Sequence, residues 1–340
     1  MTTDRSILLV GTGGWGREVA RAINASPRWC LAGLVDTDPQ ALASTRDALP
    51  APQPPVFKDA LSAAKATRPD AIAMVVPNPA RQPLLEHFLR AGFPAFVEKP
   101  LVHSPDQLSR LGEILAEYPT PLMVAQNYRY SAHSRALRRF IEDAQFGRLR
   151  EIHIAFARNG RNFAGHPVSR MAGPTGLLME LGIHHLDLLR YLVGQEPSVL
   201  HAEAASPLKE FAGWTRIDAD LAFPSGTTAH YSARYNAAHD ETPWGGSWNF
   251  IFDHGEAHYF PCPSADAPAI RFSPVPPFGW PKDLPTPDAR EQRQNLLQAA
   301  LAEFATSLDE NRPAETGFAD NCLTIKTAFA IARAAGWDFA

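Results

Sequence analysis

The sequence lacks the features that mark membrane, secreted and nucleic-acid-binding proteins. No apolar run approaches the roughly 18 residues that a membrane-spanning helix needs, and the first residues do not form a secretory signal. Only 3 cysteines occur in 340 residues, without a CxxC pair, so neither a disulfide framework nor a zinc ribbon is expected. The formal net charge of −4 gives no electrostatic footprint for nucleic acid. We therefore expect a cytoplasmic protein that has no nucleic-acid or membrane partner.

The first part of the chain alternates between short apolar runs and stretches of helical spacing. The predicted strands are Ile7–Val10, Leu31–Val35, Ala71–Val76, Ala95–Val97 and Leu122–Ala125. The predicted helices are Arg17–Asn24, Ala60–Thr67, Pro83–Ala91 and Pro105–Glu117. This alternation predicts a doubly wound parallel sheet, which binds its ligands at the carboxyl ends of its strands.

The second part of the chain has the period-2 pattern of half-buried strands, which predicts a mainly antiparallel sheet with one open face. The strands are Leu149–Ala157, Ile217–Phe223, Thr227–Tyr235 and Trp248–Phe252, and the helices are Gly176–Val193, Ala289–Leu308 and Asp320–Ala335. An apolar open face needs a cover, so we expect a homodimer or homotetramer. The fold class is thus α/β for the first part and α+β for the second.

The segment Pro261–Pro287 is rich in proline and cannot contain a helix or a central strand. We interpret it as an ordered excursion anchored by Phe272, Phe278 and Trp280, and a mobile linker is the alternative.

A glycine-rich turn, Gly11-Thr12-Gly13-Gly14-Trp15-Gly16, follows the first strand and opens the first helix. In this context Gly11 permits a tight turn, Gly13 lets the backbone approach a pyrophosphate, and Gly16 lets the helix pack against the strand. Asp36 ends the next strand, where a carboxylate binds the adenosine ribose hydroxyls. Neither Thr37 nor Asp38 offers a positive charge to a 2′-phosphate, so the sequence favours NAD over NADP.

Lys99 directly follows the buried-looking strand Ala95–Val97, at the edge of the sheet where ligands bind. A partly desolvated ammonium at this place can hydrogen-bond a substrate hydroxyl and stabilise the alkoxide that forms as its proton leaves. A surface ion pair between Glu98 and Lys99 is the structural alternative.

The order of these motifs resembles the glucose–fructose oxidoreductase/inositol dehydrogenase family, often written Gfo/Idh/MocA. The resemblance rests on the glycine turn, Asp36, Val76-Pro77-Asn78, Glu98-Lys99-Pro100, Asn127-Tyr128-Arg129-Tyr130, Gly147–Ile152 and the helix Gly176–Asp187. It implies a Rossmann dinucleotide-binding domain in residues 1–127 and a substrate-binding and oligomerisation domain in residues 128–340, whose C-terminal helix can pack back on the first. It also implies a cis bond between Lys99 and Pro100.

We expect the dinucleotide to contact the glycine turn, the end of the second strand and the family positions that line the cofactor. These residues are Gly11, Thr12, Gly13, Gly14, Trp15, Gly16, Asp36, Thr37, Pro77, Asn78, Glu98, Lys99 and Asn127.

The helix Gly176–Val193 carries Glu180 and His184, which are four residues apart and share one face of an α-helix. A carboxylate one turn before an imidazole fixes its tautomer and supports its charged form, as a general base near neutral pH requires. His185 points about 100° away, so we expect one of the two histidines to be structural. The resemblance implies that His184 is the base and that Glu180 replaces the family's usual Asp. A metal site at Glu180 and His184, or two interior histidines, are the alternatives, and we predict no metal.

The resemblance implies reversible oxidation of a secondary alcohol on a sugar, cyclitol or related polyol, with hydride transfer to NAD, or else to NADP. His184 removes the hydroxyl proton, Lys99 stabilises the oxygen and Glu180 supports His184. Expected substrate contacts are Lys99, Arg129, Tyr130, Arg158, Asn159, Arg161, Asn162, His184 and His185, although each flanking residue taken singly also suits a solvated surface. The alternatives are an NAD-dependent glycosidase or epimerase with a transient redox step, and a non-catalytic dinucleotide-binding regulator.

Overall fold

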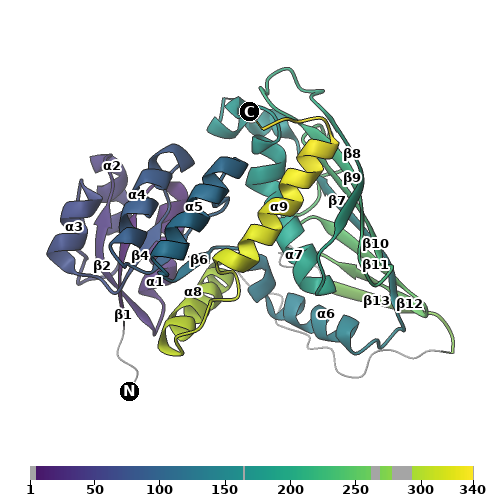
Figure 1. Ribbon diagram of the computed structural model, residues 1–340, viewed down its shortest axis with the longest axis horizontal. Helices are drawn as coiled ribbons and strands as arrows, with labels where there is room; N and C mark the ends of the chain where they lie inside the picture. The colour runs from purple at the N-terminus through teal and green to yellow at the C-terminus, as the bar shows by residue number, and fades with distance from the viewer. Residues whose placement is uncertain (1–4, 164, 262–268, 278–292, 340) are drawn as a thin grey trace. The chain divides into compact units, whose positions relative to one another are not determined.

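The protein consists of two compact units, each described here by itself (Figure 1). A computed structural model describes residues 5–163, 165–261, 269–277 and 293–339. Unit 1 comprises Met1–Asn127 and Arg293–Cys322, and unit 2 comprises Tyr128–Gln292 and Leu323–Ala340. Residues 293–322, which the sequence analysis assigned to the second domain, therefore cluster with the first.

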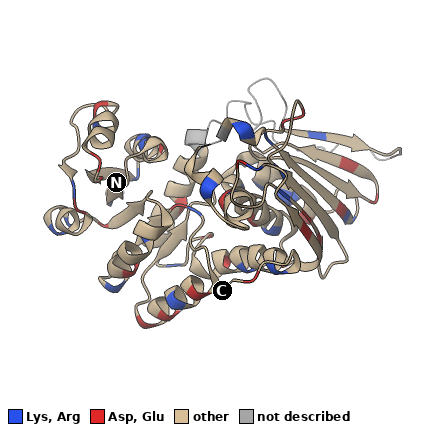
Figure 2. Cartoon of the chain, turned by 90° about the horizontal axis from the view of Figure 1, so that it is seen from above, with Lys and Arg blue, Asp and Glu red and all other residues tan. Residues whose placement is uncertain are grey.

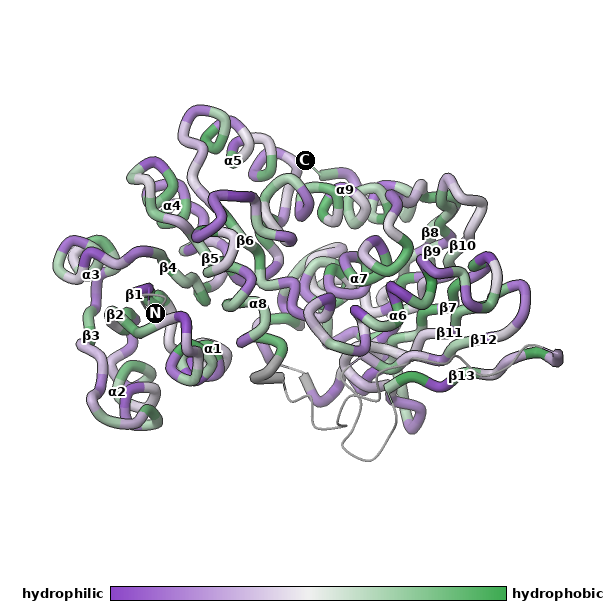
Figure 3. The backbone as a smooth tube through the Cα atoms, turned by 90° about the horizontal axis from the view of Figure 1, so that it is seen from below, coloured by the Kyte–Doolittle hydropathy of each residue, from purple (hydrophilic) through white to green (hydrophobic). Residues whose placement is uncertain are grey.

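Unit 1 contains a six-stranded parallel sheet in the order β3-β2-β1-β4-β5-β6. The strands are β1 (Arg5–Val10), β2 (Trp29–Val35), β3 (Val56–Phe57), β4 (Ala71–Met74), β5 (Ala95–Val97) and β6 (Leu122–Val124). Strands β4, β5 and β6 are buried along their whole length and are mainly hydrophobic in Figure 3, because helices cover both faces of such a sheet. The strand order reverses between β1 and β4, the place where this fold binds dinucleotides. The predicted doubly wound fold is confirmed.

The helices between these strands begin where the sequence supplies capping groups. They are α1 (Gly14–Asn24), α2 (Pro39–Asp47), α3 (Ala60–Thr67), α4 (Asn78–Arg90) and α5 (Pro105–Glu117). The Ser104 hydroxyl accepts the Gln107 N–H at the start of α5, and the Asp38 carboxylate accepts the Gln40 N–H at the start of α2. The sequence analysis predicted α5 with these bounds and missed α2.

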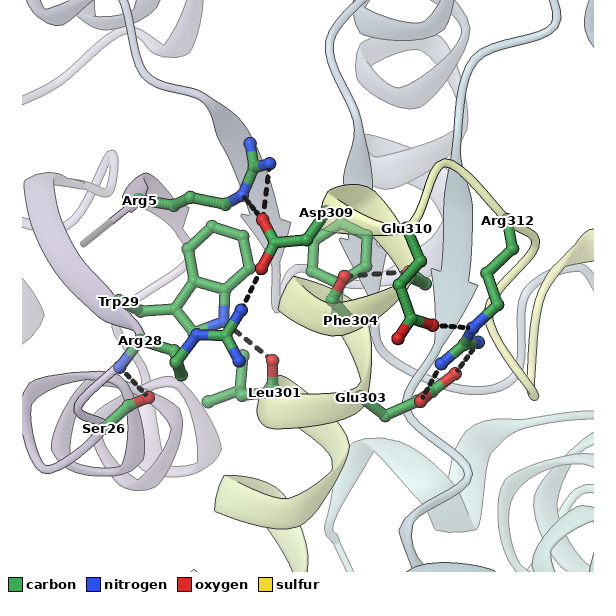
Figure 4. A network of polar contacts seen from close by, with 11 residues as sticks. Arg5, Ser26, Arg28, Trp29, Leu301, Glu303, Phe304, Asp309, Glu310 and Arg312 are labelled. Carbon is green, nitrogen blue, oxygen red and sulfur yellow. Dashed lines mark hydrogen bonds and ion pairs between the residues drawn. The ribbon is translucent and has the colours of Figure 1, made fainter. Parts of the chain in front are cut away.

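Helix α8 (Arg293–Asp309) belongs to unit 1 because its side chains are bound to β1 and β2 (Figure 4). The indole N–H of Trp29 donates to the Leu301 carbonyl oxygen at 2.7 Å, and the Trp29 ring stacks on Phe304 with centroids 5.4 Å apart. The Asp309 carboxylate accepts from Arg5 at 2.7 Å and also from Arg28. A segment from the end of the chain thereby completes the core of unit 1.

Unit 2 contains a mixed seven-stranded sheet in the order β13-β12-β11-β7-β10-β9-β8. The strands are β7 (Leu149–Ala157), β8 (Ser198–Ala205), β9 (Arg216–Ala222), β10 (Thr228–Arg234), β11 (Ser247–Phe252), β12 (Gly255–Tyr259) and β13 (Ile270–Pro274). All neighbours are antiparallel except β7 and β10, which are parallel. The prediction of a mainly antiparallel sheet is confirmed.

Strand β13 comes from the proline-rich segment and forms an edge of the sheet, where a strand tolerates proline. Phe272 on this strand packs against Phe140 with ring centroids 4.7 Å apart, so it is an anchor as predicted. The other two expected anchors, Phe278 and Trp280, lie outside the described residues.

The apolar face of this sheet is covered within unit 2 by helices α6 (Ala132–Glu142) and α7 (Ile183–Val193) (Figure 1). Trp248 and Phe250 are fully buried on it, Phe140 of α6 packs on Phe252, and His185 of α7 packs on Trp248. The sequence analysis expected an apolar open face that a second copy would cover. That reason for an oligomer fails because the unit's own helices cover the apolar side chains.

The opposite face is polar. The strand register aligns one row of side chains across all seven strands, namely Arg271, His258, Asn249, His153, His230, Asp220 and His201. The histidines pair with acidic neighbours, as His230 does with Asp220 at 2.7 Å. Figure 2 shows basic and acidic residues interspersed on these strands, so the face carries no field of one sign.

Among the helices of the described residues, none combines the length and the apolar character that a membrane span requires. Within the same residues, no group of three or more His, Cys, Asp or Glu side chains is arranged to hold a metal ion.

Candidate active site

The glycine turn of unit 1 has the backbone geometry that its spacing predicts. Gly11 has φ +99°, and a Cβ on it would overlap the Val75 carbonyl oxygen. A Cβ on Gly16 would overlap the Gly11 carbonyl oxygen, so the helix start and the strand end are in direct contact. Gly13 and Gly14 face open space within 4 Å. The start of α1 has no side-chain cap and no acidic residue in its first turn, which leaves its N–H groups available to an anion.

We expect Gly16→Ala to cost about 1–3 kcal/mol of stability and to weaken NAD binding, because the added methyl group forces the turn apart. Gly13→Ala is the matched control, since its methyl group meets no protein atom within 4 Å. It should leave thermal unfolding unchanged and weaken NAD binding only. Thermal melts and NADH titration measure the two effects, and equal stability of both variants would contradict the expectation.

Asp36 follows β2 and is held by the glycine turn. Its carboxylate accepts the Thr12 backbone N–H at 2.7 Å and the Thr12 hydroxyl at 3.0 Å, and its other oxygen accepts the Asp38 N–H at 3.0 Å. Thr12 itself is buried, and its carbonyl accepts the Thr45 hydroxyl at 2.8 Å. An ionised carboxylate has about four acceptor sites, so capacity remains for a ribose hydroxyl. Thr12 thus orients the Asp36 carboxylate. The sequence analysis did not predict this contact between the two residues.

The segment Glu98-Lys99-Pro100 follows β5 and is bound to two helices of unit 1. The Trp15 indole N–H donates to Glu98 Oε1 at 2.7 Å, and Arg81 of α4 donates to the Pro100 carbonyl. Lys99 is half-buried, and its bond to Pro100 is cis, as the resemblance implied. Nothing in the local sequence pattern singled out Arg81, because its role depends on how α4 packs beside the loop.

Two buried amides in unit 1 fit a bound dinucleotide. Asn127 Oδ1 and both polar side-chain atoms of Gln126 are buried with no hydrogen-bond partner among the described residues. Asn78 begins α4 after Pro77 and donates weakly to the Leu101 carbonyl at 3.5 Å. Buried polar atoms normally have partners. Together with the open Gly13 and the oriented Asp36, these groups fit a dinucleotide, whereas Thr37 is exposed.

In unit 2, His184 lies at the junction of two helical segments. Residues Thr175–Gly182 form a π-helix, and α7 continues from Ile183. The sequence analysis expected one regular α-helix over Glu180 and His184, whereas Glu180 lies in the wider turns of the π-helix and His184 in the first turn of α7. The Glu180 carboxylate acts on Tyr235, whose pKa is raised by burial and, to a lesser degree, by this charge.

The imidazole of His184 stacks on the ring of Tyr128, with centroids 4.8 Å apart and planes inclined by 24°. This contact fixes the plane of the half-buried His184 ring. Tyr128 belongs to the motif Asn127–Tyr130, but the sequence analysis assigned it no role. Only the packing of that short segment against α7 reveals it.

His185 is a core residue. It is 1% exposed, and its two ring nitrogens lie 3.1 Å from the Tyr231 hydroxyl and 3.3 Å from the Trp244 carbonyl oxygen. Burial lowers the pKa of His185 to about 4, so the ring is neutral near pH 7. Of the two adjacent histidines, the structural one is therefore His185, and its expected contact with substrate receives no support.

His185 makes stability depend on pH in a defined window. From pH 6.5 down to about 4 the unfolded chain binds a proton that the folded chain does not, so stability falls as pH falls, by about 3 kcal/mol in all. We expect His185→Gln to flatten this dependence in urea unfolding at pH 4.5 and pH 6.5. His201→Gln, at an exposed histidine, should keep the wild-type slope, and an unchanged slope in His185→Gln would refute the assignment.

Arg129 is committed to an internal ion pair. Its guanidinium donates to both oxygens of Asp187, with Nε at 2.9 Å from Oδ2, and the two side chains are 5% and 2% exposed. Asp187 also accepts the Thr324 hydroxyl at 3.1 Å. The expectation that Arg129 contacts substrate therefore receives no support, because its bidentate donors hold Asp187 of α7.

The remaining expected substrate contacts differ in their surroundings. Tyr130 is 8% exposed beneath the Arg135 guanidinium. Arg158 donates to the Thr242 carbonyl, pairs with Glu241 at 3.2 Å and lies over the Trp244 ring. Arg161 is exposed and lies 4.0 Å from Glu210. Asn159 directly precedes the short 3-10 turn Gly160–Phe163, and Asn162 lies within it. Of these charged side chains, Arg161 is the one that packing leaves most open.

Comparison with protein families matches both units. Residues 5–126 match the family described as "Oxidoreductase family, NAD-binding Rossmann fold", and residues 134–258 match "GFO/IDH/MocA C-terminal domain". The chain belongs to the Gfo/Idh/MocA family. The predicted family is confirmed, and the model that matches unit 1 is the one described as NAD-binding, in agreement with the predicted cofactor.

Individual family members resemble this chain at low identity. An inositol 2-dehydrogenase from Rhizobium meliloti is 28% identical over 197 residues, which are 58% of this chain and 57% of the relative. The matches to curated relatives thus span about half of the length of several of them.

Two solved structures share the Gfo/Idh/MocA fold over nearly the whole chain. An oxidoreductase from Agrobacterium radiobacter, in complex with NAD+, L-tartaric acid and magnesium, has a TM-score of 0.80 at 19% identity and covers 98% of this chain and 96% of its own. A scyllo-inositol dehydrogenase from Lactobacillus casei with NAD(H) and scyllo-inositol has a TM-score of 0.77 at 19% identity, covering 98% of this chain and 97% of its own.

Proposed function

We propose that this chain is an NAD-dependent dehydrogenase that oxidises a secondary alcohol of a cyclitol, sugar or related polyol, or reduces the matching ketone. The observation that carries the proposal is the position of Lys99 directly after β5, joined through Glu98 to the glycine turn of an NAD-binding unit. The Rhizobium meliloti relative is an inositol 2-dehydrogenase, which supports a cyclitol or a similar polyol as the substrate class.

In the proposed mechanism, two residues act on one substrate hydroxyl. The His184 imidazole accepts the hydroxyl proton while its ring plane is fixed by Tyr128. The Lys99 ammonium hydrogen-bonds the same oxygen and stabilises its developing negative charge. NAD, when bound, supplies the acceptor for the hydride that leaves the adjacent carbon. Lys99 belongs to unit 1 and His184 to unit 2.

For the cofactor, we propose NAD rather than NADP. The α1 N–H groups and Gly13 would hold the pyrophosphate, and Asp36, oriented by Thr12, would accept the ribose hydroxyls. A 2′-phosphate would meet the Asp36 carboxylate, and neighbouring Thr37 supplies no cation to offset the repulsion.

The experiment is a panel of inositols, sugars and sugar acids incubated with NAD or NADP, followed by the absorbance of the reduced nicotinamide. Net NADH formation with a polyol supports the dehydrogenase. Conversion of a substrate without net NADH would instead indicate an epimerase or glycosidase with a transient redox step. Dinucleotide binding without any conversion would indicate a regulator.

We also propose that the chain forms a homodimer or homotetramer through the outer face of the seven-stranded sheet. The support is the polar row on that face, whose basic side chains and Asp220 can complement one another across a symmetric pair. Light scattering on wild type and on His153→Glu tests this. A monomeric wild type would refute it.

A further inference from the structure

One side-chain hydrogen bond in unit 1 joins the turn that binds the dinucleotide to the loop that carries Lys99. Trp15 is in the first turn of α1, next to the open glycines Gly13 and Gly14. Its indole N–H donates to Glu98 Oε1 at 2.7 Å, and Glu98 directly precedes Lys99. The spacing of a dinucleotide-binding turn does not require an indole at this position, so the role of the Trp15 side chain has to be sought in its own contacts.

The acceptor of this bond is a buried carboxylate. Glu98 is 8% exposed, and burial raises its pKa, against which Lys99, the Trp15 N–H and Arg81 act in that order. A buried carboxylate holds a fixed orientation only when donors satisfy it, since each missing donor leaves a desolvated acceptor. The Trp15 N–H therefore lowers the pKa of Glu98 and favours the ionised form of this residue, which directly precedes Lys99.

The backbone on the other side of Lys99 is held by α4. Arg81, which is 3% exposed, donates to the Pro100 carbonyl, and Gln82 donates to the Leu101 carbonyl at 2.6 Å. Residues before and after Lys99 are thus bound to two different helices. The backbone on both sides of Lys99 is therefore held, and the charges of Glu98 and Lys99 act on each other.

We propose that Trp15 is a positioning residue for the reaction, which holds Glu98 and through it directs the Lys99 ammonium toward the substrate oxygen. This inference rests on the proposed role of Lys99. It assigns to Trp15, for which the sequence analysis expected only a contact with the dinucleotide, a second role through its indole N–H.

The decisive variant is Trp15→Phe, which keeps an aromatic ring and removes the N–H donor. We expect kcat to fall by about 10–100-fold, the size of a lost hydrogen bond to a charged group, while the Kd for NADH stays within about threefold of wild type. Trp29→Phe is the matched control, because it removes an indole hydrogen bond to the Leu301 carbonyl in the same unit. It should change neither kcat nor the Kd for NADH.

A second readout does not need turnover. Acetic anhydride labelling followed by peptide mass spectrometry gives the acetylation rate of Lys99 relative to Lys58 and Lys65 in the same sample. In Trp15→Phe the Lys99 rate should rise at least about threefold, because the carboxylate that favours its charged form is no longer held in place. If wild type oxidised no polyol, the proposed function would fall, and this rise would still establish the link from Trp15 to Lys99.

Glu98→Gln tests the bond from the other side and covers the case in which Trp15→Phe does not fold. It keeps an acceptor for the indole and removes the charge, so Lys99 acetylation should rise here too. The double variant should be no worse than Glu98→Gln alone, because both changes interrupt one interaction. The inference would be overturned if the loss of kcat in the double variant equalled the product of the two single losses. An unchanged Lys99 acetylation rate in either single variant would also overturn it.

Discussion

Replacing His184 by alanine lowers kcat for polyol oxidation by about 10²–10⁴-fold, the usual contribution of a positioned general base. NADH binding remains, because the glycine turn and Asp36 belong to unit 1 and His184 belongs to unit 2. Steady-state kinetics and NADH titration separate the two effects. His201→Ala, at an exposed histidine of β8, is the matched control and should retain full turnover. Unchanged turnover in His184→Ala would remove this residue from the mechanism.

Lys99→Met belongs to the same prediction. It keeps the apolar length of the side chain and removes the ammonium, so kcat should fall by about 10²–10³-fold, as for the loss of one group that stabilises an oxyanion. Because both residues act on one oxygen, the double variant should lose less than the product of the single losses. Lys58→Met removes a lysine that follows the short strand β3 and should have no effect on kcat.

Breaking the Arg129–Asp187 ion pair has the largest expected effect on stability. Either Arg129→Met or Asp187→Leu should cost about 3–5 kcal/mol, because each leaves one desolvated charge without its partner. The double variant should recover much of the loss, since two apolar side chains replace the whole pair. Urea unfolding followed by circular dichroism measures the series.

This series also decides what Arg129 does. As a structural residue it changes stability strongly, whereas a substrate contact would raise KM and leave stability nearly unchanged. The matched control is the surface pair Arg138–Glu142, whose side chains are 35% and 51% exposed and whose removal should cost about 0.3–0.5 kcal/mol. Equal stability losses for the two pairs would refute the assignment of Arg129.

Several elements were predicted with the bounds that the structure has. Ala60–Thr67, Ala95–Val97, Pro105–Glu117 and Leu149–Ala157 agree at both ends. In each, the apolar period and the residues at the ends point to the same structure. Helix α6 was missed, as α2 was, because its apolar stripe is short and lies among charged residues such as Arg138.

The residues of the site were likewise predicted only in part. His184 and His185 are adjacent, and no rule of spacing distinguishes a half-buried ring stacked on Tyr128 from one enclosed by Tyr231 and Trp244. The π-helix before Ile183 has no signature in the 3.6-residue period, because wider turns form where packing favours them.

The sequence by itself determined the fold class, the glycine turn, Asp36 and the place of Lys99 after its strand. These features depend on the backbone freedom of single glycines and on the alternation of strands and helices, which a few neighbouring residues encode. Only the tertiary structure decided that Arg129 holds Asp187, that α8 completes unit 1 and that Trp15 holds Glu98. Such contacts join segments that are far apart in the chain, and a charge or a donor gains its partner only when packing removes both from water.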